Sequence, residues 1–273
     1  MPEITANGVS LHYTDSGGEG RPVVLVHGWP LSSASWSEQV PALTEAGYRV
    51  IAYDRRGFGE SEKPADGYDY NTLAADLAGL FDGLDLTDAS LVGFSMGGGE
   101  VARYAGQHGT GRLHSVVFAS AVTPYLLKTD GNPEGGLEES GVQEMEEGAR
   151  TDRANFLDGF TTNFFTAGEE LKVTEAQRQQ AIALQQPARD EAVVDCIGAF
   201  GRTDFRDDLT KIDVPALIIH GDSDGIVPFE VSGKRTAQAI PGSTLVVVED
   251  APHGFNVSHH EAFNAALLEF LAR

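Results

Sequence analysis

The sequence contains a single cysteine, Cys196, among its 273 residues. One cysteine forms neither a disulfide within the chain nor a cysteine-rich metal cluster, so a disulfide scaffold and a zinc-finger site are excluded. No run of 18 or more apolar residues is present, and the first residues lack a basic region followed by an apolar stretch. These absences predict a chain without a membrane span or a secretion signal, soluble and located in the cytoplasm.

Basic residues are few as well: 19 Lys and Arg stand against 41 Asp and Glu, a formal net charge of -22. This charge repels phosphate backbones and anionic lipids, so neither nucleic acid nor a membrane is an expected partner. The acidic residues are scattered along the chain, which favours a role in solubility. The histidines show no metal-ligand spacing and no HExxH motif, so no metal site is expected.

Short apolar runs alternate with segments of helical spacing, which predicts strands alternating with helices. The apolar runs cover residues 23–26, 49–53, 89–94, 113–119, 216–219 and 245–248. Helical spacing is found over residues 72–84, 99–108, 231–240 and 260–271. Apolar strands that alternate with helices are typical of an α/β fold with a mostly parallel sheet covered on both faces.

Between residues 121 and 215 this alternation gives way to helical pieces and loops. We therefore expect a core formed by residues 1–121 and 215–273 and a helical cap formed by residues 122–214. No flexible linker separates the two parts, so they are expected to fold as one unit.

The segment Gly93-Phe94-Ser95-Met96-Gly97 lies between an expected strand and an expected helix. A Gly-x-Ser-x-Gly pattern in this context is typical of a nucleophile elbow, a strained turn that pushes the serine hydroxyl out of the sheet. The chain packs so closely on both sides of such a turn that Gly93 and Gly97 must lack side chains. Ser95 is therefore the predicted nucleophile.

A serine hydroxyl needs a base within hydrogen-bond reach, and that base is oriented by a carboxylate. The chain order Ser, Asp, His is expected for this kind of elbow. His253 follows the expected strand 245–248 and is the predicted base. Asp222 and Asp224 both lie on the loop after strand 216–219, so both are candidates for the acid.

A tetrahedral intermediate also needs two NH donors for its oxyanion. Met96, directly after the nucleophile, offers one of them. The loop after strand 23–26 should supply the other, and the NH of Trp29 is placed to serve. Pro30 has no NH and is excluded as the donor.

These residues resemble those of the α/β-hydrolase superfamily, specifically its branch of arylesterases and cofactor-free (non-heme) haloperoxidases, also called perhydrolases. The similarity covers nearly the whole chain. Its motifs are VLVHGWP, YDRRGFGES, GFSMGGGEVARY, TPYLLKTDGNPEGG, TDFRDDLTKIDVPALIIHGDSDGIVPFE and APHGF. The resemblance implies an α/β-hydrolase fold with the triad Ser95, Asp224 and His253, in which Asp222 is structural. It also implies that Trp29 and Met96 are the oxyanion donors.

The resemblance implies a serine hydrolase that cleaves small carboxylic (aryl or alkyl) esters through an acyl-enzyme, without metal or other cofactor. It also implies a perhydrolase side reaction, in which a carboxylic acid acylates the serine, hydrogen peroxide replaces water, and the released peracid oxidises halide. A proline after the oxyanion tryptophan, here Pro30, is associated in this branch with better perhydrolysis. Because the loop around Asp224 and the DCIGAF stretch resemble the arylesterases more closely, ester hydrolysis ranks first.

By their positions, five residues are predicted to line a small apolar acyl pocket, although a core role is equally open for any one of them. They are Pro30, Val122, Phe160, Phe200 and Ile226. Arg55 and Arg56 are interpreted as tying down their own turn rather than touching substrate. The family resemblance also implies a homo-oligomer, a trimer or a hexamer.

Two alternatives stay open at this point. A lactonase or a γ-lactamase-type amidase could use the same site for small cyclic substrates, and the sequence does not separate them from an esterase. A non-catalytic ligand-binding protein of the same fold is the other alternative, although no triad residue is missing. Dehalogenases and epoxide hydrolases need an aspartate at the nucleophile position, so Ser95 excludes them.

Overall fold

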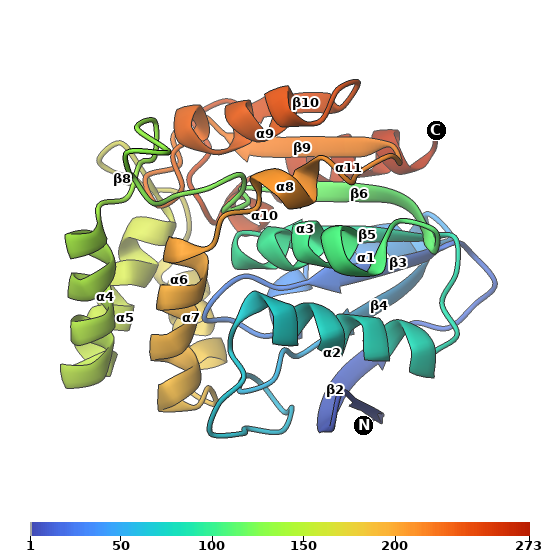
Figure 1. Cartoon of the computed structure of the whole chain (residues 1–273), viewed down its shortest axis with the longest axis horizontal. Coiled ribbons are helices and arrows are strands. Elements are labelled where there is room, and N and C mark those ends of the chain that lie inside the picture. The colour runs from blue at the N-terminus through green and yellow to red at the C-terminus, as the bar shows by residue number, and fades with distance from the viewer. Residues whose placement is uncertain (1) are drawn as a thin grey trace.

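A central sheet with helices on both faces dominates the computed structural model, which describes residues 2–273 (Figure 1). The sheet has eight strands in the order β1-β2-β4-β3-β5-β6-β9-β10. Their bounds are β1 (Glu3–Ala6), β2 (Val9–Asp15), β3 (Pro22–Val26), β4 (Arg49–Tyr53), β5 (Ala89–Phe94), β6 (Leu113–Ala119), β9 (Ala216–Gly221) and β10 (Thr244–Val248). Neighbours from β4 to β10 pair in parallel, whereas β1 and β2 are antiparallel. This mostly parallel sheet confirms the predicted fold class.

The helices fall into two groups, those that flank the sheet and those inserted between β6 and β9. The first group is α1 (Gln39–Glu45), α2 (Tyr70–Gly83), α3 (Met96–His108), α9 (Gly233–Ala239), α10 (Phe255–Ser258) and α11 (His260–Leu271). The second is α4 (Glu139–Thr151), α5 (Arg153–Phe164), α6 (Glu175–Gln185), α7 (Asp190–Arg202) and the short α8 (Arg206–Leu209), with the hairpin β7 (Thr166–Ala167) and β8 (Glu170–Leu171). Two 3-10 turns, η1 (Ser33–Trp36) and η2 (Phe229–Val231), complete the elements.

Successive side chains of the central strands point to opposite faces of the sheet, and both faces are apolar. In β3, Val24 and Val26 share a buried cluster with residues of α2 and α3. Val23 and Leu25 share a second cluster with residues of α1 and α11. Each fully buried aliphatic side chain stabilises the fold by roughly 1.5–3 kcal/mol. The strands therefore form a rigid platform for the loops at their carboxyl ends.

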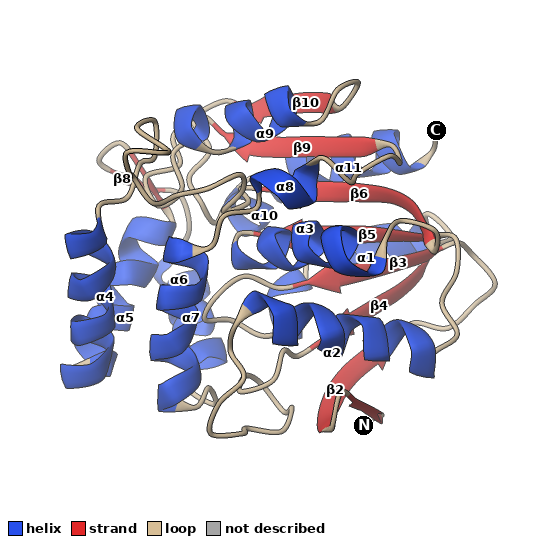
Figure 2. Cartoon of the chain, in the orientation of Figure 1, coloured by secondary structure: helices blue, strands red, loops and turns tan. Residues whose placement is uncertain are grey.

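Helices α4 to α7 stand beside the carboxyl ends of the strands, on the side to which the arrows of β3 and β9 point (Figure 2). The division into a core of residues 1–121 and 215–273 and a cap of residues 122–214 remains our proposal. Two hydrogen bonds between these parts support their folding together. Trp29 Nε1 donates to the Val193 carbonyl at 3.0 Å, and the Arg189 NH donates to the Gly57 carbonyl at 2.8 Å.

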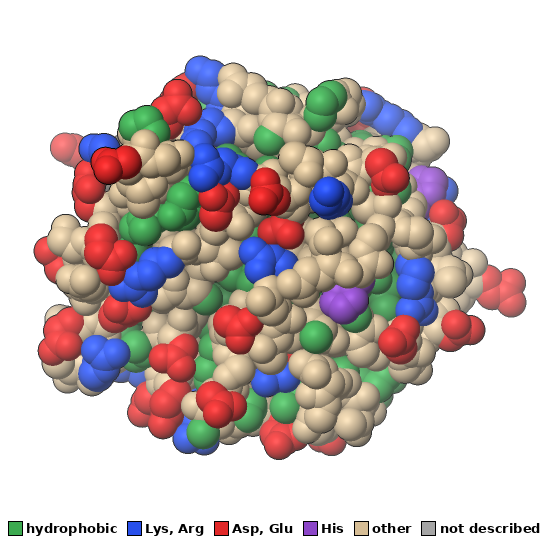
Figure 3. Space-filling view, viewed as in Figure 1, with side chains coloured by type: hydrophobic (Ala, Val, Ile, Leu, Met, Phe, Trp, Pro, Cys, Tyr) green, Lys and Arg blue, Asp and Glu red, His purple; other side chains and the backbone are tan. Residues whose placement is uncertain are grey.

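Acidic side chains are scattered over the face seen in Figure 3, with basic side chains between them. No single acidic patch dominates this face. None of the helices between residues 2 and 273 combines the length and the apolar character that a membrane crossing requires.

Candidate active site

Ser95 lies in the tight turn between the last residue of β5 and the first residue of α3. Its backbone angles are φ 54° and ψ -120°, a region that non-glycine residues rarely adopt. Such a strained conformation persists only where the surrounding structure imposes it, and it is common at reactive side chains. Ser95 is 7% exposed, so its hydroxyl lies in a nearly closed site.

The glycines on either side of Ser95 leave no room for a side chain. A Cβ atom added at Gly93 would lie 2.4 Å from the carbonyl oxygen of Gly97. One added at Gly97 would lie 2.4 Å from the carbonyl oxygen of Val26, at the end of β3. The prediction that both positions must lack side chains is confirmed.

The structure brings Ser95, His253 and Asp224 into one chain of hydrogen bonds. His253 Nε2 lies 2.8 Å from Ser95 Oγ, and His253 Nδ1 lies 2.7 Å from Asp224 Oδ2. A carboxylate accepts but does not donate, so Nδ1 carries the proton and Nε2 is free to accept from the serine hydroxyl. The imidazole is fully buried and lies close to the rings of Phe94 and Phe164, with ring centroids 5.3 and 5.0 Å away.

Asp224 is held in place by the backbone of its own loop. Its Oδ1 accepts hydrogen bonds from the NH groups of Ile226 at 3.0 Å and Val227 at 2.8 Å, which leaves Oδ2 for His253. Burial alone would raise the pKa of Asp224, but the charge of His253 and the hydrogen bonds from His220 and His253 outweigh it. The pKa of this carboxyl therefore lies well below its usual range.

Asp222, the other candidate for the acid, makes no hydrogen bond to the imidazole. It is exposed, and its Oδ1 accepts from the NH of Asp250 at 2.8 Å and from the Ser223 hydroxyl at 3.0 Å. The carboxylate therefore ties the loop after β9 to the loop after β10. Of the two acids on this loop, only Asp224 contacts His253.

His220 is a contact of the acid that the sequence analysis did not identify. Its Nε2 lies 2.8 Å from the Val227 carbonyl, so this nitrogen carries a proton, and it lies 3.3 Å from Asp224 Oδ2. The available signal was its position at the end of strand β9, four residues before the acid.

One expected oxyanion donor directly follows Ser95 in the chain, and the other belongs to the loop after β3. Met96 is the first residue of α3, so its NH has no partner within the helix. The loop carrying Trp29 packs against the elbow, because a Cβ atom added at Gly28 would lie 3.2 Å from the Ser95 Cβ. Within residues 2–273 the NH of Trp29 has no hydrogen-bond partner. Both NH groups are therefore free to bind a ligand oxygen.

The indole of Trp29 is fixed by the inserted helices. Its Nε1 donates to the Val193 carbonyl of α7 at 3.0 Å. Its ring meets Phe160 of α5 edge-on, with centroids 5.0 Å apart, and lies 5.6 Å from the ring of Phe200. The inserted helices thus hold the side chain of Trp29 in one position.

A cavity of about 510 Å³ opens above Ser95, a volume typical of small-molecule sites. It is lined by Trp29, Ser95, Val122, Leu126, Gly136, Leu137, Met145, Asn155, Phe156, Gly159, Phe160, Asn163, Phe200, Gly225, Ile226, Val227, Pro228 and Val231. No lining side chain carries a charge, as expected for an apolar pocket.

Four of the five predicted pocket residues line this cavity: Val122, Phe160, Phe200 and Ile226. Pro30 is buried but is not among the lining residues. Sequence reasoning missed the lining residues of α4 and of the segment before it, Leu137 and Met145. Their only sequence signal was an apolar residue at helical spacing in an otherwise acidic stretch.

Several known proteins are similar to this chain. The family model described as alpha/beta hydrolase fold matches residues 21–259. The chain is 45% identical over 270 residues to the non-heme chloroperoxidase CPO-A1 of Kitasatospora aureofaciens, with 98% of each chain covered. It is 36% identical over 270 residues to the bifunctional esterase/perhydrolase DCH of Acinetobacter calcoaceticus, again with 98% of each covered. The crystal structure of a bromoperoxidase from Bacillus anthracis matches with a TM-score of 0.97 and 50% identity over 100% of this chain and 99% of that one.

Proposed function

Because this chain belongs to the α/β-hydrolase fold family, in its branch of esterases and non-heme haloperoxidases, we propose that it is a serine hydrolase of small carboxylic esters. The observation that carries this function is the hydrogen-bonded series Ser95, His253 and Asp224 at the base of an uncharged cavity. Turnover of p-nitrophenyl acetate by the purified chain, together with its inactivation by one equivalent of a phosphonate ester, tests it.

In the proposed acylation step, Ser95 Oγ attacks the ester carbonyl carbon while its proton passes to His253 Nε2. The carbonyl oxygen becomes an oxyanion, which accepts hydrogen bonds from the NH groups of Met96 and Trp29. Asp224 stabilises the imidazolium through Nδ1. When the intermediate collapses, the C–O bond to the leaving group breaks, and the departing alkoxide or phenoxide takes the proton from Nε2.

In the proposed deacylation step, water attacks the acyl carbon and gives a proton to His253 Nε2. Collapse of the second tetrahedral intermediate breaks the bond to Ser95 Oγ, which recovers that proton, and releases the carboxylic acid. Each step leaves the same two NH groups facing the oxyanion, so one site serves both halves of the reaction.

Perhydrolysis is the second activity that we propose for the same site, since the relative from Acinetobacter calcoaceticus is named an esterase/perhydrolase. Hydrogen peroxide then attacks the acyl carbon in place of water, and one of its protons goes to His253 Nε2. Collapse of this intermediate breaks the bond to Ser95 Oγ, which takes the proton back from Nε2, and a peracid leaves. The proposed partners are accordingly a small ester or carboxylic acid and hydrogen peroxide. A cytoplasmic location and assembly into a trimer or a hexamer stay predictions.

Replacing Pro30 by leucine is expected to lower the ratio of peracid to carboxylic acid formed from the acyl-enzyme by about tenfold. This is the effect of losing one hydrogen bond to the peroxide. Pro30 does not itself line the cavity, but it directly follows Trp29, which does. Its backbone carbonyl is the proposed acceptor for the peroxide OH, and leucine would let this carbonyl move because it frees the backbone angle that proline restricts. The measurement is the ratio of peracid to carboxylic acid released from one ester as the peroxide concentration rises. An unchanged ratio would remove Pro30 from the proposal.

The cavity lining predicts a preference for uncharged acyl groups. The p-nitrophenyl monoester of succinic acid is expected to react with a kcat/KM at least about 100-fold below that of p-nitrophenyl butyrate, because its carboxylate would be buried without a partner. The net charge of -22 also repels the anionic ester, which lowers its kcat/KM further. The methyl ester of the same succinate serves as the control, since it has no charge and should restore turnover. Equal rates for the charged and uncharged esters would contradict this substrate class.

A further inference from the structure

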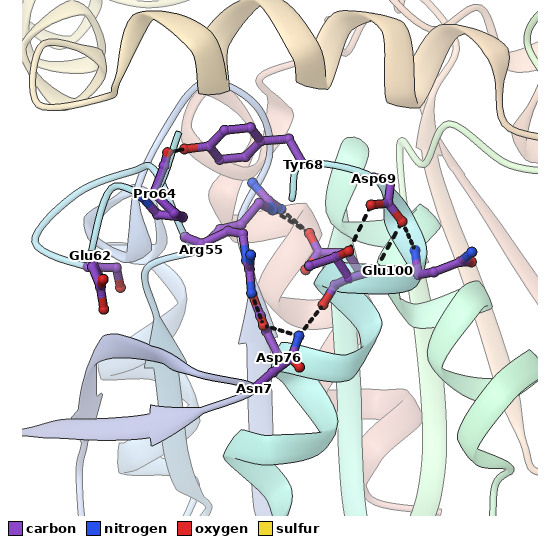
Figure 4. Close-up of polar contacts among 12 residues, drawn as sticks. Asn7, Arg55, Glu62, Pro64, Tyr68, Asp69, Asp76 and Glu100 are labelled. Carbon is purple, nitrogen blue, oxygen red and sulfur yellow. Dashed lines mark hydrogen bonds and ion pairs between the residues drawn. The ribbon is translucent and has the colours of Figure 1, made fainter. Parts of the chain in front are cut away.

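An ion pair between Arg55 and Glu100 is buried between the turn after β4 and helix α3 (Figure 4). Arg55 follows β4 and is 1% exposed, and Glu100, in the second turn of α3, is 0% exposed. Arg55 Nε donates to Glu100 Oε1 at 2.5 Å, and the Tyr53 hydroxyl donates to Glu100 Oε2 at 2.8 Å. Both carboxylate oxygens are therefore occupied, and the side chain of Glu100 has one defined position.

The other side of Arg55 is bound to the loop that leads to Trp29. Its NH2 group donates to the His27 carbonyl at 2.6 Å, and its backbone NH donates to His27 Nε2 at 3.0 Å. His27 Nδ1 in turn lies 2.8 Å from the carbonyl of Gly28 and donates to it. Burial and the neighbouring charge of Arg55 hold the pKa of His27 well below its usual range, so the imidazole is neutral and keeps this arrangement.

One continuous series of hydrogen bonds therefore runs from Glu100 on α3, through Arg55 and His27, to Gly28. Its first end lies on the helix whose initial NH belongs to Met96. Its last end directly precedes Trp29. Together the two ends carry both NH groups proposed to bind the oxyanion.

None of Arg55, Glu100 and His27 lines the cavity, so these side chains do not contact substrate. A buried ion pair is also a weak source of stability, since apolar residues of similar volume often stabilise a fold at least as well. What such a pair does supply is a fixed relative position of the two elements it joins. The pair of Arg55 and Glu100 fixes the oxyanion loop, which is the loop after β3 that carries Trp29, relative to helix α3.

We propose that Arg55 and Glu100 are positioning residues, which set the direction of the Trp29 NH relative to the Met96 NH. This inference rests on the proposed function, because it assigns the two NH groups to the oxyanion. It extends the reaction machinery to a pair of side chains that the substrate never reaches. Loss of the pair should therefore weaken binding of the transition state and leave binding of the ground-state ester unchanged.

A neighbouring ion pair provides a matched control. Arg56 Nε lies 2.5 Å from Asp76 Oδ2, and both side chains are buried. Asp76 also accepts a hydrogen bond from Asn7 Nδ2 at 3.0 Å (Figure 4). This pair joins the turn after β4 to α2 and to the turn before β2. It contacts neither His27 nor α3, so it shares the burial and charge of the first pair without its connection to the oxyanion loop.

The test compares the double variants Arg55→Met/Glu100→Gln and Arg56→Met/Asp76→Asn. Each removes both charges of one pair, so no lone buried charge remains, and each amide retains an acceptor for Tyr53 or Asn7. With p-nitrophenyl butyrate, kcat of the first variant is expected to fall by about 10- to 100-fold while KM stays unchanged. This loss is smaller than that expected from deleting one NH donor of the oxyanion, because the NH group is displaced and not removed. The inhibition constant of a boronic acid, which forms a tetrahedral adduct on Ser95, should rise by the same factor. The second variant should keep both values.

The proposal would be overturned if the two double variants had equal kcat values, or if the inhibition constant of the boronic acid were unchanged in the first variant. The ion pair of Arg55 would then have a purely structural role. If the first variant does not fold, the single change Arg55→Lys decides. Lysine keeps a positive charge facing Glu100, but it lacks the second guanidinium nitrogen that donates to the His27 carbonyl. We therefore expect kcat to fall while the melting temperature stays unchanged. A parental kcat in Arg55→Lys would contradict the proposal. Absence of turnover in the parent protein would instead contradict the proposed function.

Discussion

Replacing Ser95 by alanine is expected to lower the hydrolysis of p-nitrophenyl acetate by about a million-fold, the scale on which serine hydrolases depend on their nucleophile. The substitution removes the hydroxyl that lies 2.8 Å from His253 Nε2. The backbone of the turn is held by Gly93, Gly97 and the packing of α3, so the fold should be retained. The measurement is steady-state turnover together with the mass of the protein after treatment with a phosphonate ester.

Ser120 offers a control from the same chain. It is fully buried, it follows the neighbouring strand β6, and it also has a positive φ of 40°. Among the described residues its hydroxyl has no hydrogen-bond partner, so it makes no hydrogen bond to His253. Ser120→Ala should therefore change turnover by no more than about twofold. Phosphonate labelling that persists in Ser95→Ala but disappears in Ser120→Ala would discard the nucleophile assignment.

Replacing Asp224 by asparagine is expected to reduce kcat by about 10,000-fold. The ionised carboxylate only accepts hydrogen bonds, and this keeps the proton of His253 on Nδ1, 2.7 Å away. Asparagine presents an NH2 group as well as an oxygen, which allows the imidazole to carry its proton on Nε2. A protonated Nε2 cannot accept the proton of Ser95. Because the pKa of Asp224 lies well below its usual range, the carboxylate is ionised at neutral pH and the loss should appear at pH 7.

Asp222→Asn is the matched comparison, since it makes the same chemical change two residues earlier on the same loop. Asp222 binds the NH of Asp250 and the Ser223 hydroxyl but not the imidazole. An asparagine oxygen can accept from both groups, so kcat should change by less than about fivefold. Comparable losses in the two variants, or a larger loss in Asp222→Asn, would show that the acid has been assigned to the wrong residue.

The nucleophile elbow was predictable from the sequence because its determinants are local. A buried strand, a Gly-x-Ser-x-Gly turn and a helix occupy one short stretch, and the close approach of Gly93 to the Gly97 carbonyl is set within that stretch. The position of His253 after β10 followed from the same kind of pattern. Parallel strands end at the same edge of a sheet, so polar residues after successive strands were expected to meet there.

The choice between Asp222 and Asp224 was different. Both acids follow β9 within four residues, and residue type and position alone left both open; only the family resemblance favoured Asp224. The conformation of the loop decides between them. Two backbone NH groups donate to Oδ1 of Asp224, which leaves Oδ2 facing the imidazole of His253, 29 residues away in the chain. Asp222 instead accepts a hydrogen bond from the backbone NH of Asp250.

By itself the sequence determined the order of the core strands and helices and the identity of the elbow, because periodicity and turn chemistry act between near neighbours. Only the tertiary structure decided which side chains converge. Pro30 does not line the cavity, whereas Met145 of α4 does. Arg55 joins His27 to a glutamate 45 residues further along the chain. These contacts depend on how the inserted helices pack against the sheet, and no local pattern specifies that packing.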